Sequence, residues 1–178
     1  KQAGIPFTVF EKNPEVGGSW FENRYPGARD DTSSRGYTHL FCYDYPYEYS
    51  YSPRDHNLKY FKWVADAFKI RGDIKFNTEV TAMLWDEMAA KWTLKTQGPD
   101  GPDVREFNAV ISCVGFLSRP LMPEIEGRES FAGDAFHMAA WPDGVDVKGK
   151  RVAVVGSGAS GYQTTPVIAE TAAHTYLF

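Results

Sequence analysis

Cysteine is scarce in this chain of 178 residues, and its scarcity excludes several kinds of protein. The two cysteines, Cys42 and Cys113, lie far apart in the sequence and form no CxxC pair. This spacing argues against a disulfide framework and against a metal site, and it fits a reducing cytoplasm. Long apolar runs are missing too. None approaches the ~20 residues that cross a bilayer, so no membrane segment is expected.

Basic runs are also missing. The formal net charge is −4, and no cluster of lysine and arginine indicates a nucleic-acid surface. Aromatic residues, in contrast, make up 15% of the chain. That share favours buried pockets or stacking surfaces over disorder.

The residue pattern of the first part of the chain predicts one strand and one helix. The strand is expected over residues 5–11, an ordered loop over 12–52 and the helix over 52–70. Ser52 is the expected N-cap of that helix, and Pro53 suits its first position. The helix would bury one apolar stripe, formed by Leu58, Phe61, Val64, Ala65 and Phe68.

A meander of strands is expected next. Residues 74–86, 91–97 and 104–115 have strand character, and QGPDGPD joins the last two through a turn. KWTLKT alternates apolar and polar residues and should be half exposed, whereas Ala109–Val114 should form a more buried strand. The proline-punctuated segment FLSRPLMPEIEG then predicts a linker.

A glycine-rich turn follows near the end of the sequence. Residues 151–178 predict a strand, a tight turn, a helix that contains Pro166, and a second strand. In a GxGxxG turn the glycines permit the tight bend, the approach of a pyrophosphate and close helix packing, while the helix N-terminus attracts the anion. A structural glycine turn is the alternative. The context favours a dinucleotide site, formed by Gly156, Ser157, Gly158, Ala159, Ser160 and Gly161.

Three earlier segments are further candidates, each with a plainer alternative. Glu11 ends the first strand, where an acid accepts from the ribose hydroxyls of a dinucleotide, although it could simply be solvated. Residues 17–20, GGSW, offer two unobstructed backbone amides beside a flat ring, or form a turn with a core tryptophan. Residues 23–31, NRYPGARDD, form either a solvated loop or a site wall with phosphate-reaching arginines and a buried aspartate.

The segment FAGDAFHMAAWPD, residues 131–143, lies before the glycine-rich turn. His137 and Trp141 would share one face if the segment were helical. Composition and spacing alone favour a structural rather than a catalytic histidine at this position.

Together these motifs resemble the Baeyer–Villiger monooxygenases. The family fingerprint, FxGxxxHxxxW followed by Pro or Asp, is complete from Phe131 to Pro142. Related flavin-containing N- and S-monooxygenases end this motif with Tyr or Phe, so Trp141 discriminates between the two groups. GGSW, NRYPGARDD, GFLSRP and GSGASGYQ match the family in the same order. KQAGIPFTVFEKN and GGSWFENRYPG look most like the branch that acts on aryl ketones such as 4-hydroxyacetophenone.

The resemblance implies roles for the residues that match. Asp31 would lie near the flavin ring and orient an active-site arginine, whereas His137 and Trp141 would couple domain movement to catalysis. The FAD would be held by Glu11, Gly17, Gly18, Ser19, Trp20, Asp31, Tyr37 and Val80. The NADPH would be held by Arg29, Asp30, the six residues of the glycine-rich turn and Gln163.

The resemblance also implies an α/β fold, that of a Rossmann-like flavoprotein with two dinucleotide-binding domains. Residues 1–117 would be a partial FAD-binding domain, residues 118–150 an interdomain linker and residues 151–178 the start of an NADPH-binding domain. The sequence opens without methionine and lacks a first GxGxxG, so we expect a fragment of a longer enzyme that is inactive by itself.

The implied reaction takes a small-molecule ketone and O2 as substrates. NADPH and FAD would support the insertion of one oxygen atom beside the carbonyl through a C4a-peroxyflavin, giving an ester or lactone. A flavin-containing N- or S-monooxygenase is the runner-up. A non-catalytic nucleotide-binding module is the alternative from another class.

Overall fold

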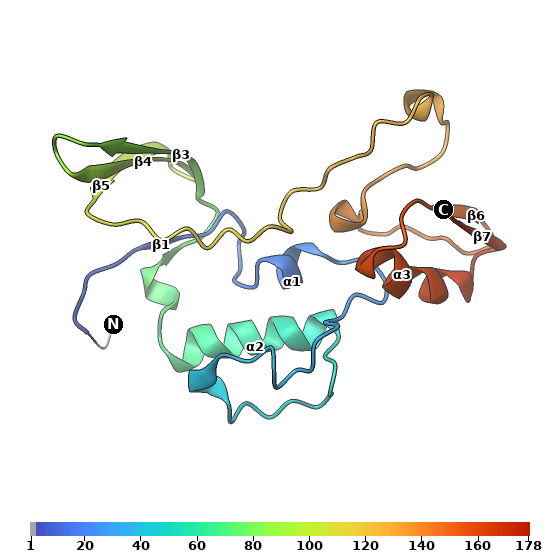
Figure 1. Ribbon diagram of the computed structural model, residues 1–178, viewed down its shortest axis with the longest axis horizontal. Coiled ribbons are helices and arrows are strands. Elements are labelled where there is room, and N and C mark those ends of the chain that lie inside the picture. The colour runs from blue at the N-terminus through green and yellow to red at the C-terminus, as the bar shows by residue number, and fades with distance from the viewer. Residues whose placement is uncertain (1–2) are drawn as a thin grey trace. The chain divides into compact units, whose positions relative to one another are not determined.

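The computed structural model describes residues 3–178, which divide into two compact units (Figure 1). The first, called the meander unit here, extends to Val16 and resumes over Phe61–Val114. The second, the turn unit, comprises Gly17–Tyr60 and Gly115–Phe178. The domain boundaries expected after residues 117 and 150 stay predictions.

An antiparallel three-stranded sheet gives the meander unit its name. It consists of β3 (Glu79–Asp86), β4 (Lys91–Gly98) and β5 (Gly101–Phe107), in the order β3-β4-β5 (Figure 1). In the central strand Leu94 and Thr96 are buried, whereas Lys91 and Lys95 are exposed. The predicted meander, its tight turn and the half-exposed character of KWTLKT are therefore confirmed.

The buried strand expected over Ala109–Val114 is wrong. This segment has no regular secondary structure, and the side chains of Ile111 and Val114 are 86% and 75% exposed. A strand is stable where a neighbour pairs with its N–H and C=O groups, and no described residue pairs with this segment. The first strand is also shorter than predicted, because only β1 (Val9–Phe10) finds a partner, the parallel strand β2 (Ile74–Lys75).

The predicted long helix is present as α2 (Arg54–Ala67). Of the predicted apolar stripe, Ala65 is buried and Leu58, Phe61 and Val64 are half-buried, but Phe68 is exposed. The fully buried ring of the helix is that of Tyr60, which the predicted stripe did not include. Ser52 does not act as the expected N-cap. Its hydroxyl lies 2.7 Å from Ser34 Oγ, and the first turn of the helix closes on the carbonyl group of Pro53. Shorter helices are α1 (Ser19–Glu22), η1 (Leu40–Cys42), η2 (Arg71–Asp73), η3 (Arg128–Ser130) and η4 (Met138–Ala140).

A β-α-β element forms the C-terminal part of the turn unit, as predicted. Strand β6 (Arg151–Val154) leads through the glycine turn into α3 (Ala159–Ala169), and β7 (His174–Leu177) returns parallel to β6 (Figure 1). Val154, Thr164 and Ile168 form its buried centre. Helix α3 continues past Pro166 to Ala169. Across the described residues, no helix combines the length and the apolar character that a membrane crossing requires.

Candidate functional site

The glycine turn between β6 and α3 has the geometry of an anion cradle. Gly156 adopts φ +106°, a conformation that side chains rarely tolerate, and its N–H donates to Phe178 O at 2.9 Å. A Cβ at Gly161 would overlap the carbonyl oxygen of Gly156, so only glycine lets α3 start this close to the turn. A Cβ at Gly158 would meet nothing within 4 Å. The turn is thus tightly packed between Gly156 and Gly161 and open at Gly158, where a phosphate group would approach.

The GGSW segment forms a second glycine turn in the same unit. Gly17 and Gly18 both have positive φ, at +126° and +48°, and α1 starts directly after them. A Cβ on Gly17 would come within 2.5 Å of a methyl carbon of Leu58, whereas Gly18 faces open space. Trp20 Nε1 donates to Tyr37 Oη at 3.1 Å, and the two rings meet edge to face with centroids 5.8 Å apart. Two of the predicted FAD residues are therefore in contact.

The Arg29–Asp30–Asp31 segment presents three charged residues in different surroundings. Arg29 and Asp31 are exposed, but Asp30 is only 4% exposed. The N–H of Asp30 donates to Ser52 O at 3.1 Å, and its Oδ2 accepts from Asn57 Nδ2 at 3.4 Å. Within the described part of the chain nothing bonds to its Oδ1. Burial raises the pKa of the Asp30 carboxyl above its usual range, although the bond from Asn57 opposes this.

We expect Asp30→Asn to stabilise the full-length protein at neutral pH and to have little effect in acid. A raised pKa means that the folded state binds the Asp30 proton more tightly than the unfolded chain does. Its contribution to stability is present below the ordinary aspartate pKa of about 3.9 and is lost as the pH rises through the raised pKa. An amide cannot ionise, so the gain should be largest at pH 8 and disappear in acid. Denaturant unfolding at several pH values measures it, and a gain independent of pH would contradict the assignment.

Helix α3 contacts the loop that carries these charged residues. Gln163 bonds to the backbone of Arg29, and Thr164 Oγ1 donates to Pro26 O at 2.9 Å. The family resemblance implied a nucleotide contact for Gln163. The contacts of Tyr25 and Thr164 between the loop and α3 were not predicted. Nothing local in the sequence indicates a pairing between segments that lie more than 130 positions apart.

The first half of the fingerprint motif is a ring packed on a glycine. A Cβ on Gly133 would lie 2.7 Å from two carbons of the Phe131 ring, so the absence of a side chain at this glycine makes room for the ring. Phe131 is nevertheless 63% exposed. An exposed ring can turn aside, so this contact alone does not require glycine at position 133.

The second half of the motif is not a helix with a shared His–Trp face. His137 precedes the short helix η4, and its Nδ1 accepts from Ala139 N at 3.1 Å. Trp141 follows η4 and packs edge to face on Phe136, with centroids 5.0 Å apart. The Nδ1 atom of His137 thus caps the backbone, which is a structural function.

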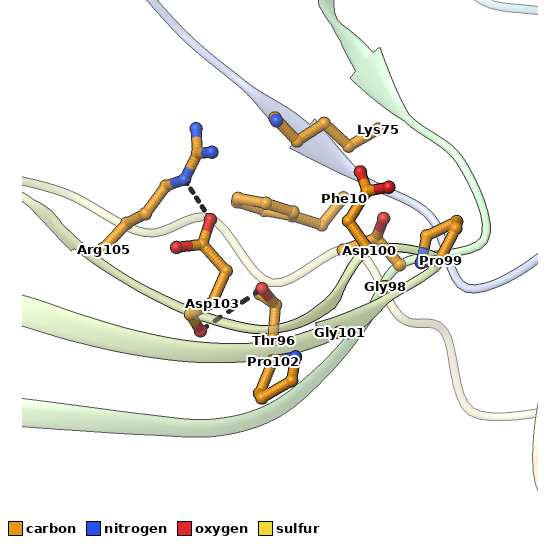
Figure 2. A pocket seen from close by; sticks show the side chains of 11 residues that line it. Phe10, Lys75, Thr96, Gly98, Pro99, Asp100, Gly101, Pro102, Asp103 and Arg105 are labelled. Atoms are coloured by element: carbon orange, nitrogen blue, oxygen red, sulfur yellow. Dashed lines mark hydrogen bonds and ion pairs between the residues drawn. The ribbon is translucent and has the colours of Figure 1, made fainter.

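Two predicted FAD residues belong to the meander unit. Glu11 follows β1 and accepts from Asn13 N at 2.9 Å, while Val80 lies half-buried on β3. This unit also contains a hollow of about 310 Å³, into which the Phe10 ring points (Figure 2). Its charged wall includes Lys75 and an Arg105–Asp103 pair at 2.6 Å. No predicted site residue lines the hollow.

The arrangement of glycine turn, charged loop and fingerprint segment can be compared with known proteins. A model of the flavin-binding monooxygenase-like family matches residues 2–178. The chain belongs to this family. The chain is also similar to a 2-oxo-Δ3-4,5,5-trimethylcyclopentenylacetyl-CoA monooxygenase of Pseudomonas putida, to which it is 37% identical over 99% of this chain and 34% of that protein. A methyl acetate-forming acetone monooxygenase of Gordonia is 37% identical over 95% of this chain and 32% of its own length.

Solved structures of monooxygenases are similar to this fold. An oxidised steroid monooxygenase bound to NADP superposes with a TM-score of 0.87 at 39% identity, over 99% of this chain and 34% of that protein. The chain thus spans about a third of the length of the relatives it matches.

Proposed function

We propose that the full-length protein is a Baeyer–Villiger monooxygenase, which uses NADPH, FAD and O2 to convert a ketone into an ester or lactone. The observation that carries the proposal is the complete fingerprint from Phe131 to Pro142, directly before an open glycine turn of the dinucleotide-binding type. A relative named as a methyl acetate-forming acetone monooxygenase supports the same reaction class. The aryl-ketone branch remains the predicted substrate class.

The NADPH site of this proposal is the glycine turn. The open position at Gly158 and the N-terminus of α3 together fit a pyrophosphate, because backbone N–H groups and the helix dipole favour an anion there. Arg29 is exposed on the neighbouring loop and can supply a further positive charge.

The FAD contacts of this proposal are the ones that the family resemblance implies. The open amide of Gly18, the Trp20–Tyr37 pair and the Glu11 carboxylate have the chemistry to bind phosphate, ring and ribose. When bound, the flavin supplies the activation of O2, which no amino-acid side chain provides. Gly17, Ser19, Asp31 and Val80 are the remaining predicted contacts.

The chain's own residues would orient and support this chemistry. Asp31 is exposed beside the buried Asp30, so it can accept from a guanidinium and hold that cation where negative charge develops. We assign His137 and Trp141 to the conformation of the linker, since His137 Nδ1 is used as a backbone cap. The two free cysteines favour a reducing compartment, and we propose the cytoplasm.

Substrate profiling of the full-length protein tests the reaction class. We expect purified protein to carry flavin and to oxidise NADPH in response to ketones, with 4-hydroxyacetophenone, cyclohexanone and acetone as the probe set. Amines and sulfides are the matched comparison. A response to these alone would indicate an N- or S-monooxygenase, and a colourless protein without flavin would indicate a non-catalytic module.

A further inference from the structure

The side-chain amide of Gln163 bonds to both backbone groups of Arg29. Its Oε1 accepts from Arg29 N at 3.3 Å, and its Nε2 donates to Arg29 O at 3.0 Å. The amide therefore pairs with Arg29 much as a residue of an adjacent strand would. The same Oε1 accepts from Tyr25 Oη at 3.2 Å. Both polar ends of Gln163 are thus engaged with the loop and not directed to the predicted pyrophosphate site.

One face of α3 makes all of these contacts. The spacing i, i+3, i+4, i+7 places four residues on this face, namely Ser160, Gln163, Thr164 and Val167. The buried Thr164 donates to Pro26 O at 2.9 Å, and Ser160 Oγ donates to Tyr25 Oη at 3.2 Å. Gly27 lies so close to the Gln163 carbonyl that a Cβ would overlap it. The loop is therefore fixed to the helix over several residues.

The same helix starts at the glycine turn, and Gln163 lies on its second turn. The side chain of Gln163 connects this helix to the charged loop, because it bonds to Arg29, which directly precedes Asp30 and Asp31. The next peptide is held independently, through the bond from Asp30 N to Ser52 O at 3.1 Å. Among the hydrogen bonds from α3 to the loop, those of the Gln163 side chain thus lie nearest to Asp31 in the sequence. A shift or rotation of α3 reaches the Arg29 peptide through this amide.

We infer that Gln163 is a positioning residue, which transmits nucleotide binding at the glycine turn to the backbone of Arg29–Asp31. The inference rests on the proposed function, since the nucleotide and the ketone enter through it. Gln163 fixes the Arg29 peptide and, through it, the direction of Asp31. It contributes little to the affinity for NADPH, because its amide is occupied by the loop.

The test compares full-length wild-type protein with Gln163→Met, which keeps a similar volume but cannot replace the paired bonds. Gln163→Glu keeps the acceptor for Arg29 N and loses the donor to Arg29 O. Tyr162→Phe is the matched control, because Tyr162 is next to Gln163 in the sequence and its side chain is 78% exposed. The measurements are hydrogen exchange in peptides that cover residues 25–31, with and without NADPH, the NADPH affinity, kcat, and the hydrogen peroxide released per NADPH oxidised.

We expect the backbone amide hydrogen of Arg29 to exchange about fivefold faster in the Gln163→Met variant than in the wild-type protein. Its NADPH affinity should stay within about twofold, while kcat falls roughly tenfold and peroxide release rises. Gln163→Glu should retain the exchange protection and lose part of kcat, and Tyr162→Phe should resemble wild type. If the Gln163→Met variant does not fold, the kcat of the Gln163→Glu variant tests the inference: a partial loss supports it, and an unchanged kcat contradicts it.

Three outcomes would overturn the inference. Weaker NADPH binding with unchanged kcat would mean that Gln163 holds the cofactor. Unchanged exchange and unchanged kcat would mean that the contact is incidental. Faster exchange in Gln163→Met with unchanged kcat and peroxide release would mean that the contact is structural only. A wild-type protein without flavin would refute the proposed function separately, and the exchange measurement on that protein would still test the bond to Arg29.

Discussion

Replacing Gly161 with alanine should abolish NADPH binding by the full-length protein and destabilise the turn unit. A Cβ at this position would overlap the Gly156 carbonyl oxygen and lie 3.2 Å from the Gly156 carbonyl carbon. Both are backbone atoms of the turn, so β6 and α3 would have to separate. Overpacking against backbone of this kind costs about 3 kcal/mol or more. Thermal unfolding and a titration with NADPH measure the two effects.

Gly158→Ala is the matched control in the same turn. A Cβ there meets nothing within 4 Å, and the φ of −70° suits any residue. We expect unchanged thermal stability and unchanged flavin content, but NADPH binding roughly tenfold weaker or worse, because the methyl group occupies the space of the pyrophosphate. Equal loss of both cofactors in Gly158→Ala, or a stable Gly161→Ala protein that binds NADPH, would contradict this account of the turn.

Gly27→Ala should have the second largest effect, through the contact between α3 and the charged loop. Gly27 has φ +81°, and a Cβ would overlap the Gln163 carbonyl oxygen and approach Val167 Cγ2 to 3.0 Å. Left-handed strain costs about 1–2 kcal/mol and overpacking about 1–3 kcal/mol. Displacement of the loop by about an ångström should lower turnover roughly 100-fold. Denaturant unfolding and steady-state kinetics of the full-length protein measure the two losses.

A second glycine, Gly144, serves as a control that separates the cost of the left-handed backbone from the cost of the overlap with Gln163. Gly144 has a similar φ of +78°, and a Cβ on it would meet nothing within 4 Å. Gly144→Ala should therefore cost only the strain, about 1–2 kcal/mol, and leave turnover intact. If the two alanine variants lose the same stability and the same activity, the close approach of α3 to Gly27 is not what the loop depends on.

Local patterns in the sequence predicted the parts of this fold whose cause is itself local. The GxGxxG turn follows from steric limits at Gly156 and Gly161, and the meander follows from alternating residues around Leu94 and Thr96. The strand expected at Ala109–Val114 failed because a strand depends on its neighbours as much as on its own residues. The N-cap expected at Ser52 failed because that hydroxyl is used by Ser34.

The candidate site shows the same limit. The fingerprint was identified through its resemblance to the family motif, and the packing of Phe131 on Gly133 is a local contact within it. The difference between buried Asp30 and exposed Asp31 could not be predicted from the sequence, because it depends on Asn57 and Ser52 from distant positions. The bond between Gln163 and Arg29 is likewise a tertiary contact, and the residue type of a glutamine does not indicate which backbone it will pair with.

The fate of molecular oxygen tests the central claim most directly. Full-length protein would be given NADPH and a ketone under ¹⁸O₂, and the product examined by mass spectrometry. The account predicts an ester or lactone that carries one ¹⁸O atom, in the oxygen inserted between the carbonyl carbon and its former carbon neighbour. Recovery of unchanged ketone with all of the label in hydrogen peroxide, or label found only in oxides of added amines or sulfides, would contradict it.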